Sequence, residues 1–330
     1  MSGVDIEELE PPLGGDLAAA FIELWEEAFG MDCAYFQGVF RGEERDHNRD
    51  LFFMNRRDGV LAGTCHVTLS RSQPQVGGFG EVVTTPQFRR QGIAGALCGR
   101  ARDVFLEVGG EALFLGTGNA EALRVYHRLG WRKLAGCNVM ALVNRSASPE
   151  VFLADYFRRG EAVRIEEGTA AARVPMIPLI VCPHDWRVLD ANTQLFSTRY
   201  VVQSSCMGLY PRYEKLVEEG GIFFEVRTGE ACLVGLATAK LDGAETCQVD
   251  GFVHGAYADA WEELMEAVLE WGGERGVIRW RARVAVEDED KRARFEGLGF
   301  SAAGAGEGFV LQERAVASTW MEKAAGVRTG

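Results

Sequence analysis

The chain has 330 residues and a formal net charge of −13. A chain of this length can form two domains with substantial cores. The acidic balance argues against non-specific nucleic-acid binding, which needs a basic face. The same charge suits a cationic small molecule, which an acidic cleft attracts, and it equally suits ordinary solubility.

The cysteines and the N-terminal residues predict a soluble, cytoplasmic protein. Eight cysteines are scattered singly and none forms a C-x-x-C pair, so we expect reduced core residues and neither disulfides nor a metal site. Residues 1–12 are acidic and lack the basic start and apolar block of a signal peptide. No apolar stretch is long enough to span a bilayer, so we expect no membrane partner.

The first predicted element is an amphipathic helix over residues 16–29. Residues 30–49 alternate polar and aromatic side chains without a clear period. Residues 51–55 and 60–69 flank an Asp-Gly turn, which predicts a β-hairpin. A loop is expected over residues 70–78.

A strand and a glycine-containing helix start follow, and they are the most informative part of the chain. Residues 79–85 are β-prone and are closed by Pro86, and residues 89–95 then open a helix. Its apolar positions recur at helical spacing at Ile93, Leu97, Ala101, Phe105 and Val108. Glycines in a first helical turn leave backbone N–H groups unpaired and uncovered, and two arginines lie just before them. Such a turn is suited to bind an anion such as a pyrophosphate.

A second apolar run and a capped helix come next. Residues 112–115 are apolar, and Asn119 is expected to cap a helix that ends at Gly130. Tyr126 lies at an apolar position of that helix. Residues 131–142 are expected to form the following strand.

This order of elements, with these residues, resembles the GNAT N-acetyltransferases, which move an acetyl group from acetyl-CoA to an amine. The family's turn has Arg or Gln, two residues, Gly, one residue, then Gly or Ala, and here it spans Arg89 to Ala94. The run from Asn119 to Trp131 resembles the family's second motif, and the two motifs together cover roughly residues 50–135. The resemblance implies an α/β (α+β) fold with a mixed, mostly antiparallel central sheet flanked by helices.

The resemblance also implies acetyl-CoA as co-substrate and direct attack by the amine. Backbone amides of the strand ending at Thr84 would hydrogen-bond the pantetheine arm, and an N–H near Val83 would polarise the thioester carbonyl. Asn119 is interpreted first as a helix cap, although its side chain could also touch the coenzyme. The full expected coenzyme-binding set is Val82, Val83, Thr84, Arg89, Arg90, Gln91, Gly92, Ile93, Ala94, Gly95 and Asn119.

Two residues are expected to carry the proton transfers. Tyr126 is the candidate general acid, because a phenol with a pKa of about 10 keeps its proton at neutral pH and can pass it to a thiolate. The alternative for Tyr126 is a core aromatic. Glu81 is the candidate general base, directly or through a water, and the alternative is a solvent-facing strand residue. His66 and His127 are interpreted as structural.

The acceptor is expected to bind after the first helix, where aromatic residues lie beside carboxylates. That composition suits a cationic amine, through cation–π contact and charge pairing. The candidate substrate-binding residues are Asp32, Tyr35 and Phe36, with Glu43, Glu44 and Asp46 nearby. We expect N-acetylation of a small primary amine such as an aminoglycoside-like antibiotic, a polyamine or an amino-acid derivative. A protein lysine or N-terminal amine as acceptor, and a sensor that binds acetyl-CoA without turnover, remain open alternatives.

The second half of the chain resembles a weaker copy of the first. Residues 221–226 and 232–241 flank another hairpin turn. A strand, a helix and a strand are then expected over residues 247–253, 258–271 and 277–286. The run from Phe295 to Phe300 matches Tyr126 to Trp131 position for position.

The copy lacks the anion-binding turn. Residues 257–263 contain no glycine and three carboxylates, which would repel a pyrophosphate. This pattern predicts a catalytic GNAT domain over residues 1–145, a degenerate GNAT-like domain over residues 150–312 and a C-terminal tail over residues 313–330. The second domain would cover one side of the cleft or serve as the surface of a homodimer.

Overall fold

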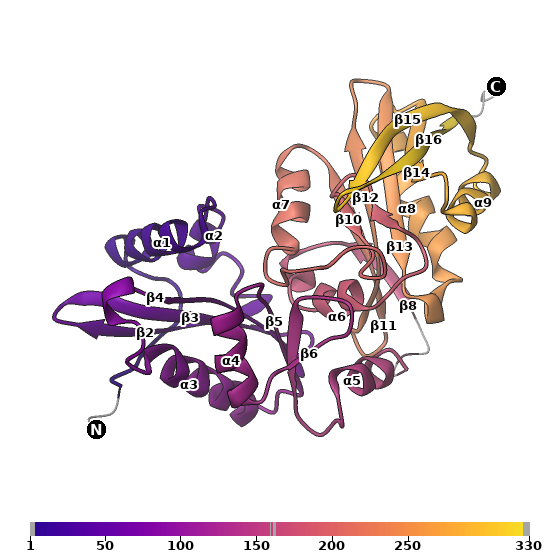
Figure 1. Cartoon of the computed structure of the whole chain (residues 1–330). Helices are drawn as coiled ribbons and strands as arrows, with labels where there is room; N and C mark the ends of the chain where they lie inside the picture. Colours follow the sequence, from indigo (N-terminus) through magenta and orange to yellow (C-terminus); the bar gives the residue numbers. More distant parts are fainter. Residues whose placement is uncertain (1–3, 159, 161–162, 326–330) are drawn as a thin grey trace. The chain divides into compact units, whose positions relative to one another are not determined.

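The computed structural model, shown in Figure 1, describes residues 4–158, 160 and 163–325. The chain divides into two compact units. Unit 1 comprises Met1–Phe152, Arg173–Ile177 and Ser204–Gly208, and unit 2 comprises Leu153–Ala172, Pro178–Gln203 and Leu209–Gly330. Two short segments from the second half of the chain therefore belong to unit 1. The domain limits expected from the sequence stay a prediction.

Unit 1 is built on a seven-stranded sheet in the order β1-β2-β3-β4-β5-β7-β6. Each neighbouring pair is antiparallel except β4 and β5, which are parallel. This confirms the expected mixed, mostly antiparallel sheet. The strands are β1 (Glu7–Leu9), β2 (Asn48–Arg57), β3 (Val60–Ser70), β4 (Val76–Thr84), β5 (Ala112–Gly116), β6 (Arg132–Lys133) and β7 (Val139–Val143).

Helices cover both faces of this sheet. Phe52 and Phe53 are consecutive residues of β2, so their side chains lie on opposite faces. Phe52 packs with apolar residues of α1 and α2, whereas Phe53 packs with those of α3 and α4. The helices are α1 (Gly15–Phe29), α2 (Phe36–Arg41), α3 (Ile93–Glu107), α4 (Ala120–Leu129) and α5 (Pro149–Tyr156), with a 3-10 turn η1 (Pro86–Phe88) before α3.

The structure confirms the first helix, the hairpin and the capped helix, and it corrects three expectations. Helix α2 forms in the region without clear periodicity, and Val108 is exposed at the C-terminal end of α3. The single strand expected over residues 131–142 is two strands, because a turn at Gly136, with a φ of 76°, separates β6 from β7.

Strand β4 begins at Val76, inside the expected loop over residues 70–78. The glycines that suggested a loop allow close packing here. A Cβ atom on Gly77 would lie 2.8 Å from Leu113 Cδ1, and one on Gly78 would lie 2.2 Å from Met207 Sδ. Only glycine fits where neighbouring side chains occupy that space.

The segment Ser204–Gly208 packs where β4 and β5 separate. The two strands are paired as far as Gly78 and Phe114. Cys206 Sγ then lies 3.9 Å from the carbonyl oxygen of Phe79 and 3.6 Å from that of Phe114, so one thiol contacts both strands. The carbonyl oxygen of Ser204 approaches Gly116 so closely that a Cβ there would lie 2.3 Å away.

Unit 2 repeats the strand order of unit 1. Its sheet has the order β15-β16-β14-β13-β12-β11-β8, and β13 and β14 form its parallel pair. Helix α8 joins these parallel strands, as α3 joins β4 and β5, and both helices have 15 residues. The strands are β8 (Val163–Glu167), β11 (Ile222–Thr228), β12 (Leu233–Leu241), β13 (Thr246–Val253), β14 (Arg279–Ala285), β15 (Ser301–Leu311) and β16 (Arg314–Ala324).

The remaining elements are helices and a two-stranded sheet. They are η2 (Ala170–Ala172), α6 (Met176–Val181), β9 (Val188–Asp190), β10 (Leu195–Phe196), α7 (Tyr210–Glu218), η3 (Gly255–Tyr257), α8 (Ala260–Glu274) and α9 (Glu289–Gly297). Most of the expected C-terminal tail is strand β16, which pairs with β14 and β15, and its last residues, 326–330, lie outside the described residues. Within the described part of the chain, no helix has the length and apolarity to cross a bilayer.

We predict that Gly116→Ala destabilises the protein by about 1–3 kcal/mol, as expected for overpacking. The new methyl group would meet backbone atoms of Ser204 and Ser205, which cannot rotate away as a side chain can. Thermal and denaturant unfolding measure the effect. Gly15→Ala, where no heavy atom lies within 4 Å of the added Cβ, is the control and should not destabilise. Equal stability of the two variants would contradict the packing of this segment.

Candidate active site

The turn between η1 and α3 presents a run of unpaired backbone donors. Gly92 precedes the helix with a φ of 84°, and Arg90 has a φ of 61°. The first hydrogen bond of the helix runs from Ala96 N to Gly92 O, at 3.0 Å. Among the described residues, the N–H groups of Arg90 through Gly95 donate to no backbone carbonyl. The sequence predicted such a run of unpaired donors, and that it binds an anion stays a prediction.

The residues of the turn leave its backbone accessible. A Cβ atom on Gly92 or on Gly95 would meet no heavy atom within 4 Å, so no neighbouring group covers these amides. Ile93 is buried and fixes the first turn of α3 to the core. The side chains of Arg89 and Gln91 are held nearby, on Thr84 O at 3.2 Å and Gln87 O at 3.5 Å, and both residues are exposed. Free amides, an open surface and arginine side chains together fit a diphosphate.

Strand β4 changes register just before this turn. Gly80 lies opposite His66, and Val83 lies opposite Thr64, so the two residues between them on β4 face one residue of β3. Glu81, at this bulge, has a left-handed φ of 52°. Its carbonyl oxygen accepts a hydrogen bond from Thr64 Oγ1 at 2.9 Å. A bulge of this kind re-aims the side chains that follow it.

The residues after the bulge lie on alternate faces of the sheet. Val82 packs against the α3 and α4 side, and Val83 against the α1 and α2 side. Thr84 pairs with Gly63. The sequence predicted these three residues to bind the pantetheine arm, and that role stays a prediction.

Glu81 does not face solvent, because its side chain is only 9% exposed. Its Oε2 lies 3.0 Å from His66 Nδ1, and His66 Nε2 lies 2.8 Å from Asp50 Oδ1. Since an ionised carboxylate can only accept, two such partners require a proton on each ring nitrogen. Burial alone would lower the pKa of His66, but hydrogen bonds to Asp50 and Glu81 raise it above its ordinary value.

His66 and Asp50 therefore belong to the site, although the sequence suggested only a structural histidine. One sequence signal could have indicated a site at His66. Thr64, His66 and Thr68 alternate along the strand, which places three polar side chains on one face of β3. The ring of His66 stacks on Phe52 at 4.2 Å with an interplanar angle of 6°.

Tyr126 lies on α4 and is mostly buried. Its ring packs against Phe79, two residues before Glu81, with centroids 6.1 Å apart in an edge-to-face arrangement. Burial, followed by nearby ionisable groups, raises the pKa of its phenol well above the usual value. The phenol therefore carries its proton at neutral pH.

The other predicted residues lie near the starts of α4 and α2. Asn119 caps α4, accepting from Glu121 N at 2.9 Å and Ala122 N at 3.1 Å, so the cap interpretation holds. Asp32 is exposed and accepts from Ala34 N. Among the described residues, neither Asn119 nor Asp32 makes a hydrogen bond to the turn at Gly92.

Phe36 is a core residue and does not offer a surface to a substrate. It is 1% exposed and contacts Trp25 and His66, with ring centroids 4.8 and 5.7 Å apart. This corrects the expectation that Phe36 binds the acceptor directly. Tyr35, by contrast, is partly accessible and packs against Phe36 at 4.7 Å.

The described residues of unit 2 lack the glycine turn and the strand bulge of this site. Helix α8 starts without a glycine, and its first turn carries Glu262 and Glu263. Strand β13 keeps its register with β12 throughout, so it has no counterpart of the bulge at Glu81. At the place of Asn119, the Asp288 carboxylate accepts from the N–H groups of Arg187 and Val188.

The space beside β13 is filled by the chain itself. Beyond the last pair of β13 and β14, at Gln248, the carbonyl oxygen of Gln248 accepts from Asn192 and the Asp250 side chain accepts from Ala191 N. Lys291 is fully buried and pairs with Asp250 at 2.6 Å. These contacts occupy the space beside β13 beyond its last pair with β14, in the described residues of unit 2.

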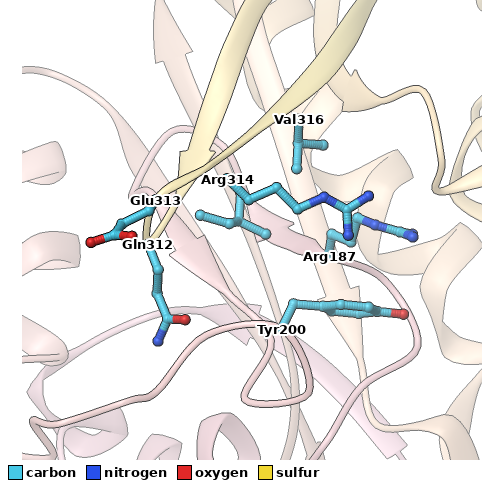
Figure 2. Close-up of a pocket in the computed structure, with 7 residues that line it drawn as sticks. Arg187, Tyr200, Gln312, Glu313, Arg314 and Val316 are labelled. Carbon is cyan, nitrogen blue, oxygen red and sulfur yellow. The ribbon is translucent and has the colours of Figure 1, made fainter.

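A cavity of about 850 Å³ in unit 2 is lined by Arg187, Tyr200 and residues near the β15–β16 turn. Figure 2 shows the guanidinium groups of Arg187 and Arg314 above the ring of Tyr200. Both arginines pair with Glu287, at 2.5 and 3.1 Å, and Arg187 also pairs with Asp288. Their charges are thus balanced within the protein, and the cavity has no built site for an anion.

The family model described as Acetyltransferase (GNAT) family matches residues 17–131. This part of the chain is a GNAT acetyltransferase domain. The match contains the whole turn at Gly92, the bulge at Glu81 and helix α4 with Tyr126. The chain therefore carries an acyltransferase domain in unit 1. No curated protein matches the chain.

Solved structures similar to the chain cover about half of it. An acetyltransferase of the GNAT family from Streptococcus pneumoniae is 15% identical and covers 50% of this chain and 100% of its own, with a TM-score of 0.39. A spermidine/spermine N-acetyltransferase from Vibrio cholerae is 15% identical, with 49% and 93% covered and a TM-score of 0.39. The ribosomal-protein-S5-alanine acetyltransferase from Vibrio fischeri is 14% identical, with 51% and 95% covered and a TM-score of 0.40. Likenesses at this level carry no argument about the substrate.

We predict that the stabilising effect of His66 depends on pH. Because its folded-state pKa is raised, the stability it contributes is fully present below the unfolded pKa of about 6.5 and is lost as the pH rises through the folded value. The free-energy difference between wild type and His66→Gln should shrink from pH 6 to pH 9 in urea unfolding. His127→Gln, at an exposed position of α4, serves as control. A difference that stays constant over this range would contradict an imidazolium at His66.

Proposed function

We propose that the protein transfers the acetyl group of acetyl-CoA to the primary amine of a small, cationic acceptor by direct attack. The observation that carries the proposal is the run of free amides from Arg90 to Gly95, which continues from the strand that bears Glu81. Tyr126 packs on the same strand at Phe79. The candidate diphosphate turn and the candidate base thus lie on one stretch of the chain, and the candidate acid packs against the strand that leads into it.

The turn at Gly92 supports acetyl-CoA as co-substrate. Its unpaired N–H groups would hold the diphosphate, with Arg89 and Arg90 adding positive charge. The residues from Val82 to Thr84 would hold the pantetheine arm through their backbone. Asn119 caps α4 through its side-chain oxygen, and its side-chain nitrogen, which donates no hydrogen bond among the described residues, remains a candidate contact.

Acetyl-CoA supplies a thioester whose carbonyl an unprotonated amine attacks. Glu81 would accept the proton that the amine loses. Tyr126 would donate the proton that the departing sulfur requires, since burial keeps its phenol protonated. A backbone N–H near Val83 would stabilise negative charge on the carbonyl oxygen.

The acceptor's charge is inferred from the acidic side chains near the base. Asp32 is exposed beside the partly accessible ring of Tyr35, and the chain as a whole carries a net charge of −13. An aromatic face beside a carboxylate attracts an ammonium group. A polyamine, an aminoglycoside or an amino-acid derivative has this chemistry.

Coenzyme binding depends on the first turn of α3, and we predict that Ala94→Glu weakens it at least about tenfold. A carboxylate among the free amides repels a diphosphate, yet it stabilises a helix N-terminus, so the fold should persist. Calorimetry with acetyl-CoA measures the loss. Gln87→Glu adds the same charge in η1, outside the run, and should bind nearly as the wild type does. Unchanged affinity in Ala94→Glu would rule out the turn as the diphosphate site.

Turnover tests the reaction. Thiol release from acetyl-CoA is followed with spermidine, kanamycin, amino-acid amides and a lysine peptide, and at least one small amine should give release above that of the peptide. With that amine, Tyr126→Phe should lose about 10²–10⁴-fold in kcat, as expected for a general acid. Its acetyl-CoA affinity should stay unchanged, because the hydroxyl makes no hydrogen bond among the described residues.

Three results would contradict the proposal. Acetyl-CoA binding without thiol release for any amine would favour a sensor. Faster release with the lysine peptide than with small amines would favour a protein acceptor. Near-normal kcat of Tyr126→Phe across the pH range would remove the acid role.

A further inference from the structure

Arg173, from the second half of the chain, is a buried cation that contacts the same carboxylate as His66, that of Asp50. Arg173 belongs to unit 1 and its side chain is 5% exposed. Its Nη1 lies 2.8 Å from Glu44 Oε2 and 3.4 Å from Asp50 Oδ1. Arg173 contacts the carboxylates of Glu44 and Asp50. His66 contacts those of Asp50 and Glu81, so three carboxylates surround two cationic side chains.

Asp50 is the junction of this cluster. Its Oδ1 accepts from His66 Nε2, from Thr68 Oγ1 at 2.7 Å and from Arg173. Burial alone would raise the pKa of Asp50, but the charge of Arg173 and the hydrogen bonds from His66 and Thr68 hold it below its ordinary value. Asp50 is thus ionised and fixes the ring of His66 from one side.

The ring of His66 is also fixed in its plane. It stacks on Phe52 and meets the edge of Phe36, at centroid distances of 4.2 and 5.7 Å. With Nε2 on Asp50 and two aromatic neighbours, Nδ1 can point only toward Glu81. Oε2 of Glu81 is held by that contact, and among the described residues Oε1 accepts no hydrogen bond.

We propose that Asp50, His66 and Arg173 form a positioning relay that holds the Glu81 carboxylate in place for the transfer reaction. The inference rests on the proposed function, in which Glu81 is the base. The amine proton passes to Oε1 while the nitrogen's lone pair attacks the carbonyl carbon, and the imidazolium keeps both of its protons. The relay moves no proton itself and acts by fixing Oε2.

Other titratable groups near Glu81 stay neutral. Burial, followed by the charge of Glu81, raises the pKa of the Cys33 thiol to about 11 and that of the Cys206 thiol to about 12. Burial and the same charge raise the pKa of the Tyr35 phenol. The charges that act on His66 at neutral pH are therefore those of Glu44, Asp50, Glu81 and Arg173.

Histidine NMR on the full chain tests the relay without any turnover. The His66 imidazole is assigned by its loss in His66→Gln and is titrated in wild type and in two variants. Asp50→Asn removes an anion and should lower the pKa of His66, whereas Arg173→Gln removes a cation and should raise it. Arg173→Lys keeps the charge and should stay close to wild type. General loosening of the site would not produce shifts of opposite sign.

Kinetics test the positioning role, with the most active amine of the panel. His66→Gln should lower kcat about 10- to 100-fold, the effect of misplacing a reacting group. The acetyl-CoA affinity should not change, and the pH profile of kcat should move. Arg227→Gln is the matched control, because Arg227 is equally buried and pairs with Glu225 in unit 2. It should alter neither the His66 titration nor kcat.

The outcomes separate the two proposals. Absence of turnover with every amine overturns the proposed function alone, while the NMR shifts still decide the relay. Shifts of the same sign in Asp50→Asn and Arg173→Gln, or no shifts, overturn the relay. Normal kcat and pH profile in His66→Gln overturn it as well.

Discussion

The candidate site of unit 1 depends on the separation of strands β4 and β5. Parallel strands of one sheet normally stay paired, but these two are paired only as far as Gly78 and Phe114, and the register of β4 then slips at Glu81. The slip turns Glu81 toward His66 and ends at the turn where α3 begins. The position of the base candidate is therefore a consequence of one local departure from regular pairing.

Such a gap must be closed, because buried backbone groups without partners are costly. In unit 1 the segment Ser204–Gly208 packs against it, and Gly78 and Gly116 are glycines because that segment comes so close. In unit 2 residues near Asn192 pack beside β13 in a comparable way, with the buried pair of Lys291 and Asp250 next to them. Two units with one strand order thus differ at the start of the helix that follows the strand, which is preceded by Gly92 in unit 1 and carries Glu262 and Glu263 in unit 2.

Local sequence signals sufficed for much of this arrangement. Periodicity, the Asp-Gly turn and the capping Asn119 predicted α1, the β2–β3 hairpin and α4, and the glycines predicted the anion-binding turn. The interactions of Arg173 and Cys206 escaped prediction, because each joins residues more than 90 positions apart and no local pattern encodes such a pair. Gly77 and Gly78 misled for a related reason, since their role is set by Phe105 and Met207 in distant segments.

The contacts of Arg173 show that a segment from the second half of the chain completes the packing of unit 1. Glu44 and Asp50 are both buried, and their shared cation comes from the second half of the chain. Removing one partner of a buried ion pair costs far more than removing a surface pair, because the remaining charge stays desolvated. The segment that closes the β4–β5 gap comes from the same half. Unit 1 is therefore complete only with the segments Arg173–Ile177 and Ser204–Gly208 from the second half of the chain.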